Sequence, residues 1–385
     1  MMMSNLHLDD VHQLRTALGK HATDFTDELV TTVAKSELSL RSDVAKLAAV
    51  DEVLLHIQGL GPLSDLITKP GVTDVLINGH DEVWFDRGDG LERADISWPS
   101  EQDLREFAVR LVNQMHRRLD ETQPFADVRL KNGVRMHAII PPLTQSGTCI
   151  SLRLPQQDAL SLDQLVAKSM LSVSASEILT DIIHAGVSFL ICGGTGTGKT
   201  TLLGALLMQI SKQQRIVVVE DLFELTVHHP HVLNLQARQS NVDGVGTVSM
   251  RHLVRQALRM RPDRLIVGEV RGVEVIDFFT AMNTGHKGGC ATIHANSARD
   301  VPARVETLGL LAGLPLSAIH NLFQCAISVI LEVKHVRNLG RRLVSLHLVE
   351  LVDGRAQTIP VFDWGAEKTS ASGLRKFENL LNSTA

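Results

Sequence analysis

The sequence predicts an α/β fold with a mainly parallel sheet, preceded by a smaller α+β domain and a helical N-terminal segment. Three observations lead to this prediction. After residue 172, short apolar runs alternate with amphipathic helical patterns, which favours parallel strands covered by helices on both faces. One apolar run leads directly into a glycine-rich loop and a helix. Upstream, two Asn-Gly turns separate β-rich runs, which is typical of hairpins.

The N-terminal half divides into three predicted parts. Residues 1–60 are polar with helical periodicity, and two glycines and a proline end that pattern. Residues 61–155 form the predicted α+β domain. Residues 156–171 are interpreted as a polar linker with a short helix. Within the α+β domain, Ser100 is predicted to cap a helix whose apolar residues recur at helical spacing from Leu104 to Met115.

Residues 172–385 form the larger predicted domain. Its helical and apolar extended patterns alternate along the chain, with predicted helices at 176–186, 199–210, 249–260 and 273–282, and predicted strands at 187–192, 215–220, 264–269 and 291–294. The segment 326–359 is interpreted as antiparallel strands. The expected result is one sheet that is parallel in its centre and antiparallel toward the end of the chain.

Composition narrows the class of protein. A net charge of −5 gives no whole-chain argument for binding nucleic acid. No apolar run approaches the roughly 18 residues of a membrane span, and the N-terminus lacks the pattern of a signal peptide. We therefore expect a cytoplasmic location. The four cysteines are scattered without a C-x-x-C pair, and all four are expected to be small core residues.

The segment GGTGTGKT matches the pattern G-x-x-x-x-G-K-[ST] of a phosphate-binding loop. Its glycines let backbone N–H groups converge on phosphate oxygens, and the following helix adds its positive N-terminal dipole. Lys199 is expected to reach the β- and γ-phosphates, and the Thr200 hydroxyl to bind Mg²⁺. The sequence thus predicts a nucleoside triphosphate site. Its loop residues are Gly193, Gly194, Thr195, Gly196, Thr197, Gly198, Lys199, Thr200 and Thr201.

Two predicted strands end in acidic residues. Glu269 ends strand RLIVGE, and is positioned to hold Mg²⁺ through water or to polarise the attacking water. Glu220 and Asp221 end strand RIVVVE, and Glu224 follows shortly after. Hydrolysis needs one carboxylate for the metal and one for the water, and general-base assistance contributes typically 10²–10⁴-fold. The sequence does not apportion these roles.

Arginines stack along the predicted helix SMRHLVRQALRM. Arg251, Arg255 and Arg259 lie on one face, with Arg261 and Arg271 nearby in sequence. One interpretation is a solvated basic face that forms ion pairs. The other is an arginine finger, with Arg255 as the candidate that reaches a neighbouring subunit's nucleotide.

The segment GHKGGCATIHANS spaces His286, Cys290 and His294 four residues apart, as metal ligands on a helix would be. Its three glycines disfavour a helix, and ATIH is typical of a strand, so the three side chains need not share a face. A zinc site is therefore disfavoured. We expect His294 to sense the γ-phosphate, His286 to help order the loop and Cys290 to pack in the core.

Four segments, in order and spacing, resemble a known family. GGTGTGKTTLL, VVVEDLFEL, ALRMRPDRLIVGEVRG and MNTGHKGGCATIHANS look like the Walker A, Asp box, Walker B and His box of secretion-superfamily ATPases. These are hexameric motors of type II and type IV secretion and type IV pili. The likeness is strongest to the CpaF-like branch, which powers Tad/Flp pilus assembly. It covers roughly residues 45–350, including the N-terminal segments GLGPLSDLITKPGVTDVLINGHDEVWFDRG and ISLRLP.

The resemblance implies a RecA-like domain that hydrolyses ATP with Mg²⁺, in a homohexamer at the inner face of the cytoplasmic membrane. It implies inner-membrane platform proteins as partners, and no direct contact with nucleic acid is expected. Lys199 and Thr200 match the phosphate and Mg²⁺ contacts, and Glu269 matches the Walker B acid and metal-site residue. Arg135 and Arg153 match N-terminal arginines that approach the nucleotide, and Arg238 is a further candidate contact.

Two alternatives remain open at this stage. The first is a type IV secretion or conjugation ATPase that serves DNA or protein transfer. The second is a nucleotide-gated regulatory module with negligible turnover.

Overall fold

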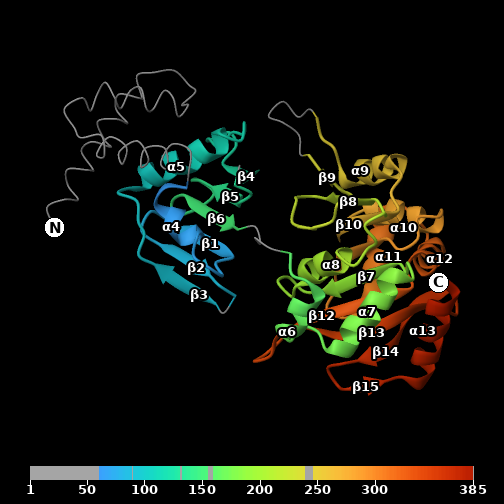
Figure 1. The fold of residues 1–385 in the computed structure, drawn as a ribbon. Helices are drawn as coiled ribbons and strands as arrows, with labels where there is room; N and C mark the ends of the chain where they lie inside the picture. The colour runs from blue at the N-terminus through green and yellow to red at the C-terminus, as the bar shows by residue number, and fades with distance from the viewer. Residues whose placement is uncertain (1–59, 89, 131, 155–158, 239–245, 385) are drawn as a thin grey trace. The chain divides into compact units, whose positions relative to one another are not determined.

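The structure is a computed structural model that describes residues 60–384, apart from residues 89, 131, 155–158 and 239–245. The helical segment predicted for residues 1–60 lies outside the described residues except for Leu60. The chain divides into two compact units between Pro155 and Gln156. Each unit has its own sheet (Figure 1) and is described by itself.

The first unit is a six-stranded antiparallel sheet with one long helix. Its strand order is β3-β2-β1-β6-β5-β4. The strands are β1 (Asp74–Asn78), β2 (Val83–Asp86), β3 (Leu91–Ala94), β4 (Phe125–Arg129), β5 (Arg135–Ile139) and β6 (Cys149–Arg153). Both Asn-Gly segments connect paired antiparallel strands, β1 with β2 and β4 with β5, as predicted. A short 3₁₀ turn (Gly61–Leu63) and α4 (Ser64–Ile67) precede the sheet.

Helix α5 (Glu101–Asn113) covers one face of this sheet. The Ser100 side chain accepts a hydrogen bond from the Asp103 backbone N–H, which is the predicted N-cap. The helix buries Leu104, Phe107, Ala108, Leu111 and Val112. Alternate strand residues such as Val75 and Ile77 are fully buried in the same core. The α+β prediction for this unit is confirmed.

The second unit contains a nine-stranded mixed sheet. Its strand order is β15-β14-β13-β12-β7-β11-β10-β8-β9. The six strands from β12 to β9 in this order run parallel to one another, and β13, β14 and β15 continue the sheet antiparallel. The strands are β7 (Phe189–Gly193), β8 (Ile216–Glu220), β9 (Val232–Gln236), β10 (Arg264–Val270), β11 (Cys290–His294), β12 (Val329–Val336), β13 (Gly340–Val352), β14 (Arg355–Asp363) and β15 (Lys368–Thr369).

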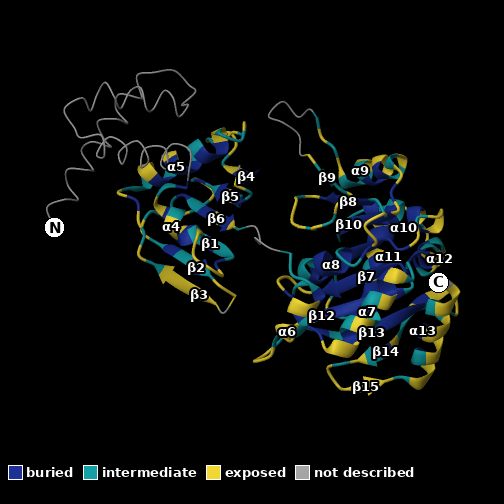
Figure 2. Cartoon of the chain, in the orientation of Figure 1, coloured by how far each residue is buried: buried dark blue, intermediate teal, exposed yellow. Residues whose placement is uncertain are grey.

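Helices cover both faces of the larger sheet. On one face, α6 (Leu162–Ala167), α7 (Val173–His184), α8 (Lys199–Leu207) and α13 (Ala371–Thr384) share a core with Phe189 and Ile191. On the other, α9 (Met250–Ala257), α10 (Glu274–Asn283), α11 (Val301–Leu311) and α12 (Leu316–Ala326) share a core with Leu190 and Cys192. Because alternate residues of β7 enter opposite cores, this central strand is buried on both sides, and Figure 2 shows it dark blue.

The predicted cysteine environments are partly wrong. Cys192 and Cys290 are buried, and burial raises the pKa of both thiols well above its ordinary range. Cys149 is half-buried and Cys325 is exposed. Helix α12 buries Ile319, His320, Phe323 and Ala326. Cys325 lies outside this buried stripe. Because the helix is short and its neighbouring residues are mostly apolar, the sequence does not show that Cys325 is on the exposed side.

Among the described residues, no helix combines the length and apolarity needed to cross a bilayer.

A buried arginine joins three segments at the amino ends of the parallel strands. Arg264, 5% exposed, donates hydrogen bonds to the backbone carbonyls of Ile183 and Gly288 and to the Gln214 side chain. Gly288 has φ +74°, and a Cβ there would overlap the Arg264 guanidinium. The glycine therefore serves both a left-handed turn and the close approach of Arg264.

Replacing Gly288 with alanine is expected to destabilise the second unit by roughly 2–3 kcal/mol, because overpacking adds to the cost of a left-handed alanine. Gly313→Ala is the matched control, since Gly313 has φ +81° but nothing within 4 Å of the added Cβ. Urea unfolding of both variants separates the two costs. Equal destabilisation by the two substitutions would contradict the Arg264 overlap.

Candidate functional site

The carboxyl ends of the central parallel strands bring the predicted site residues together. His294, at the end of β11, pairs in register with Gly193, at the end of β7. Glu269 lies near the end of β10, the other neighbour of β11. Parallel strands place these ends on one edge of the sheet, where α/β proteins bind their ligands. Three segments far apart in sequence thus meet at one place.

The glycine-rich loop connects β7 to α8. Gly198 has φ +95° and precedes the first residue of the helix, Lys199. The Lys199 ammonium donates hydrogen bonds to the loop's own carbonyls, 2.9 Å from Gly193 O and 2.7 Å from Gly194 O. Thr200 and Thr201 follow in the first turn of α8. The loop therefore presents a cation and a helix N-terminus, a combination suited to anionic oxygens.

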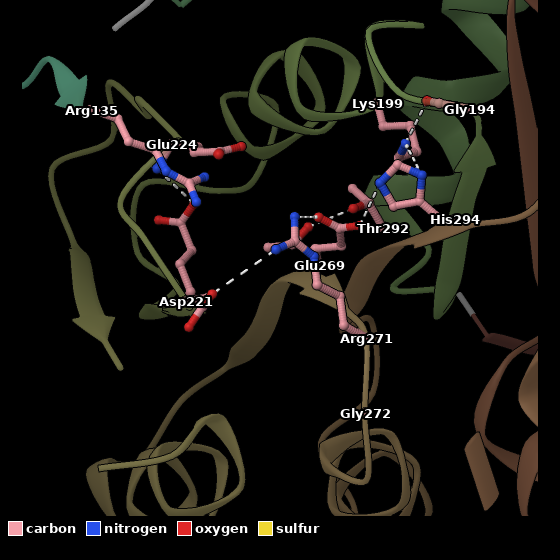
Figure 3. A network of polar contacts seen from close by, with 12 residues as sticks. Arg135, Gly194, Lys199, Asp221, Glu224, Glu269, Arg271, Gly272, Thr292 and His294 are labelled. Carbon is pink, nitrogen blue, oxygen red and sulfur yellow. Dashed lines mark hydrogen bonds and ion pairs between the residues drawn. The ribbon is translucent and has the colours of Figure 1, made fainter. Parts of the chain in front are cut away.

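Glu269 lies between two cationic or proton-bearing side chains (Figure 3). His294 Nε2 is 2.6 Å from Glu269 Oε1, and an Arg271 guanidinium nitrogen contacts Glu269 Oε2. Arg271 also lies 4.0 Å from Asp221 Oδ2. Its contact with Glu269 raises the pKa of Arg271. The Glu269 carboxylate is thus contacted by His294 through one oxygen and by Arg271 through the other.

His294 links this carboxylate to the phosphate loop. Its Nδ1 lies 3.5 Å from Lys199 Nζ. Because the lysine ammonium can only donate, Nδ1 is the acceptor, and a neutral ring then carries its proton on Nε2, the nitrogen beside Glu269. Burial, with help from the Lys199 charge, lowers the pKa of His294. Burial also lowers the pKa of Lys199, and the nearby Glu269 opposes that shift.

Glu220 has a different environment from Glu269. It is 3% exposed, and its Oε1 accepts hydrogen bonds from the Glu224 and Leu225 backbone N–H groups. A Cβ on Gly268 would lie 2.7 Å from Glu220 Cγ, so this glycine allows the carboxylate its position. Glu220 therefore fixes the loop that carries Asp221 and Glu224. Asp221 is exposed and faces Arg271.

The structure does not bring His286 to the phosphate loop. Cys290 starts β11 opposite Phe189, the first residue of β7, and His286 precedes it. His294 lies at the other end of the same strand. His286 and His294 therefore lie at opposite edges of the sheet, and Cys290 is buried between them, although the three residues are equally spaced in the sequence. Among the described residues, no group of three His, Cys, Asp or Glu side chains could hold a metal ion.

The remaining predicted residues form contacts within their own units. Arg251 and Arg255 contact opposite oxygens of Asp277 at 2.7 and 2.6 Å, so both form ion pairs within their own subunit. The Arg238 side chain donates to Gly246 O just after β9. In the first unit, Arg135 contacts Asp127 and Arg153 contacts Asp74, both at 3.1 Å.

Arg271 is the residue to which the sequence analysis assigned no role. Its signal was its place two residues after the acidic end of a strand, but only the structure shows that it contacts that acid. Glu274, at the start of α10, accepts hydrogen bonds from the Arg271 and Gly272 backbone N–H groups. The turn after β10 is thus fixed, which holds Arg271 beside Glu269.

The site fits a nucleoside triphosphate and Mg²⁺. Magnesium commonly keeps several waters and takes only one or two protein ligands besides phosphate oxygens. The Thr200 hydroxyl would be a direct ligand, and Glu269 would hold an ordered water. A dedicated cluster of carboxylates is not required by this chemistry.

The lowered pKa of His294 predicts the direction in which activity changes with pH. Since the folded-state pKa of His294 lies below its ordinary value of 6.5, the ring is neutral at pH 7 and gains a proton only in more acidic solution. That proton would remove the acceptor for Lys199. We expect turnover to change little through this group between pH 7 and 8 and to fall only at pH values below the ordinary histidine pKa of 6.5. Initial rates for wild type and His294→Gln should differ in their acid limbs, and identical limbs would contradict the assignment.

A model for the type II/IV secretion system protein family matches residues 56–362. The chain belongs to this family. A Mycobacterium tuberculosis protein named for conjugal transfer is 43% identical over 349 residues, which are 89% of this chain and 99% of that protein. The type IV secretion system protein PtlH of Bordetella pertussis is 28% identical over 325 residues, 77% of this chain and 93% of that protein.

Solved structures of similar fold include a pilus motor and an ATPase. The pilus retraction motor PilT with bound ADP has a TM-score of 0.54 and 18% identity, covering 81% of this chain and 84% of that one. The ATPase DotB of Legionella pneumophila has a TM-score of 0.51 and 18% identity, covering 81% and 82%. The predicted RecA-like fold of this secretion family member is thereby confirmed.

Proposed function

We propose that the protein is a Mg²⁺-dependent ATPase that works as a homohexameric motor on the cytoplasmic side of an inner membrane. The observation that carries this proposal is the contact series from Lys199 through His294 to Glu269 at the mouth of a phosphate loop. It couples the residue that would bind the γ-phosphate to the residue that would act on water. A module that only binds nucleotide has no need of that coupling.

Each residue has a role in the proposed reaction. On ATP binding, Lys199 exchanges the carbonyls of Gly193 and Gly194 for phosphate oxygens. Glu269 accepts a proton from, or orients, the water that attacks the γ-phosphorus, and the bond from that phosphorus to the bridging oxygen of ADP breaks. The Thr200 hydroxyl would help hold Mg²⁺, which would supply positive charge beside the transferred phosphoryl group. His294 reports the presence of the γ-phosphate to Glu269.

Arg271 controls the availability of Glu269 in this scheme. While it contacts Glu269, it occupies the carboxylate oxygen Oε2 and compensates the charge of that group. A bound γ-phosphate offers Arg271 a second anionic partner, in addition to Asp221. Transfer of Arg271 to these groups would free Glu269 to act on water. In this scheme Glu269 at the end of β10 acts on water, whereas Glu220 at the end of β8 fixes the loop that carries Asp221.

The finer assignment is a motor for assembly of a Tad/Flp-type pilus, acting through an inner-membrane platform protein. It is supported by the order and spacing of the four motifs and by the N-terminal segments that resemble the CpaF-like branch. In a ring, Arg135, Arg153 and Arg238 would contact nucleotide, and Arg255 would be the finger candidate once released from Asp277.

The second candidate is a conjugation or type IV secretion ATPase. It is favoured by the names of two relatives, one for conjugal transfer and one for type IV secretion.

Purified protein should assemble in the presence of nucleotide into particles of six times the 42.2 kDa subunit mass. Mass photometry tests this, and a monomer under all nucleotide conditions would contradict the motor. Marked stimulation of ATP turnover by DNA would favour conjugation over pilus assembly.

A further inference from the structure

We propose that Arg341, on the hairpin of β12 and β13, is an additional nucleotide-binding residue that contacts the phosphates of ADP and ATP. This inference rests on the proposed function, since it concerns the same nucleotide site. It assigns a contact to a part of the chain that lies outside the four motifs, more than forty residues beyond the last of them.

The hairpin is in direct contact with the phosphate loop. Strand β12 pairs in parallel with β7, which ends in that loop. A Cβ on Gly193 would collide with the Val333 carbonyl, so the β12 backbone lies against the first residue of the loop. Leu343 N donates a hydrogen bond of 2.9 Å to Met170 O, which fixes β13 against the segment before α7. The position of the hairpin is therefore determined by main-chain contacts.

Arg341 is the hairpin residue that reaches the other end of the loop. A Cβ placed on Gly198 would lie 3.4 Å from Arg341 Cδ and 3.0 Å from Met170 Cε. The arginine stem thus runs beside the last glycine before Lys199, and the guanidinium begins one atom farther on. Arg341 is exposed, so its charge remains available to a ligand at the mouth of the loop.

The other cations of this hairpin are less suited to the role. Lys334 lies 2.5 Å from the buried carboxylate of Glu332, which compensates its charge. Arg342 Nε donates to the carbonyl of Leu339 within the hairpin turn. Arg337 belongs to the turn itself, beyond the paired residues that lie beside the loop. Within the part of the chain that the structure describes, the Arg341 side chain forms neither a hydrogen bond nor an ion pair.

A nucleotide gives this free cation an evident partner. A nucleoside di- or triphosphate brings several negative charges to the loop, where Lys199 and the backbone N–H groups are the donors already in place. Arg271 is engaged by Glu269 on the opposite side, across β11. A planar guanidinium binds phosphate oxygens with paired donors, and such charge-assisted contacts are among the stronger ones in proteins. Arg341 would therefore add affinity for nucleotide without acting on the γ-phosphorus.

The test compares Arg341→Ala with two matched variants in the full-length chain. The Kd values for fluorescently labelled ADP and ATP are measured by titration, and kcat is measured at saturating ATP. We expect Arg341→Ala to raise both Kd values by about tenfold. We expect kcat to stay within about twofold of wild type. Arg341→Lys should recover part of the affinity, and Arg337→Ala, which removes a charge from the same hairpin away from the loop, should bind like wild type.

The outcomes separate this inference from the proposed function. Wild-type protein that binds neither nucleotide would refute the proposed function itself. Wild-type binding with unchanged Kd values for Arg341→Ala would overturn the inference alone. An equal loss for Arg337→Ala would also overturn it, since the effect would then belong to the general charge of the hairpin. A loss confined to ATP, or to kcat, would show a contact other than the one proposed.

Discussion

Replacing Lys199 with alanine is expected to lower ATP turnover by at least about 10²-fold, because the variant loses the cation that stabilises charge on the transferred phosphoryl group. In the structure the same ammonium donates to the carbonyls of Gly193 and Gly194. The substitution therefore also removes a contact that orders the loop, and nucleotide affinity should fall together with kcat. Phosphate release at several ATP concentrations measures both effects.

Lys212→Ala is the control for Lys199→Ala, since Lys212 is an exposed lysine outside the predicted site. Thermal unfolding of the two variants checks that each is folded. The account requires a normal rate for Lys212→Ala and a near-background rate for Lys199→Ala. A Lys199→Ala protein that hydrolyses ATP like wild type would exclude the phosphate-loop assignment.

Replacing Glu269 with glutamine is expected to reduce kcat by roughly 10²–10⁴-fold while ATP binding remains close to wild type. The amide keeps the shape of the side chain and can still contact His294, but it cannot take a proton from water. It also loses the ion pair with Arg271. Single-turnover phosphate release, combined with a nucleotide titration, separates the chemical step from binding.

Glu177→Gln makes the same chemical change on the exposed surface of α7 and should leave kcat unaltered. Glu220→Gln offers a second comparison, because that carboxylate accepts two backbone hydrogen bonds and fixes the loop after β8. An undiminished kcat for Glu269→Gln would show that another group activates water. Asp221 and Glu224 would then be the next residues to substitute.

The parts of the fold that depend on local pattern were predictable from sequence. The order of strand, glycine loop and helix around Lys199 follows from neighbouring residues, as does the Ser100 cap of α5. The location of Glu269 and His294 near the phosphate loop was also predictable. Both lie near the carboxyl ends of apolar strands, and parallel strands place those ends on one edge.

The features that depend on distant pairing were not predictable. The sequence assigned His286 to ordering the loop near His294, whereas His286 precedes β11 and His294 ends it, so the two lie at opposite edges of the sheet. The contact of Arg271 with Glu269 depends on the conformation of one turn, and the place of Arg341 depends on a hairpin that pairs beside β7. Neither leaves a periodic signal. The ion pair of Arg255 with Asp277 likewise joins two helices whose packing a single sequence does not reveal.

The central claim is that this chain hydrolyses ATP, and steady-state phosphate release by the purified full-length wild-type protein tests it most directly. The rate should be measured with Mg²⁺ and again with excess EDTA. We predict turnover that saturates with ATP, requires Mg²⁺ and falls at least about 10²-fold in Glu269→Gln. Tight ATP binding by wild type with no phosphate release above background would contradict the account and would indicate a nucleotide-gated module instead.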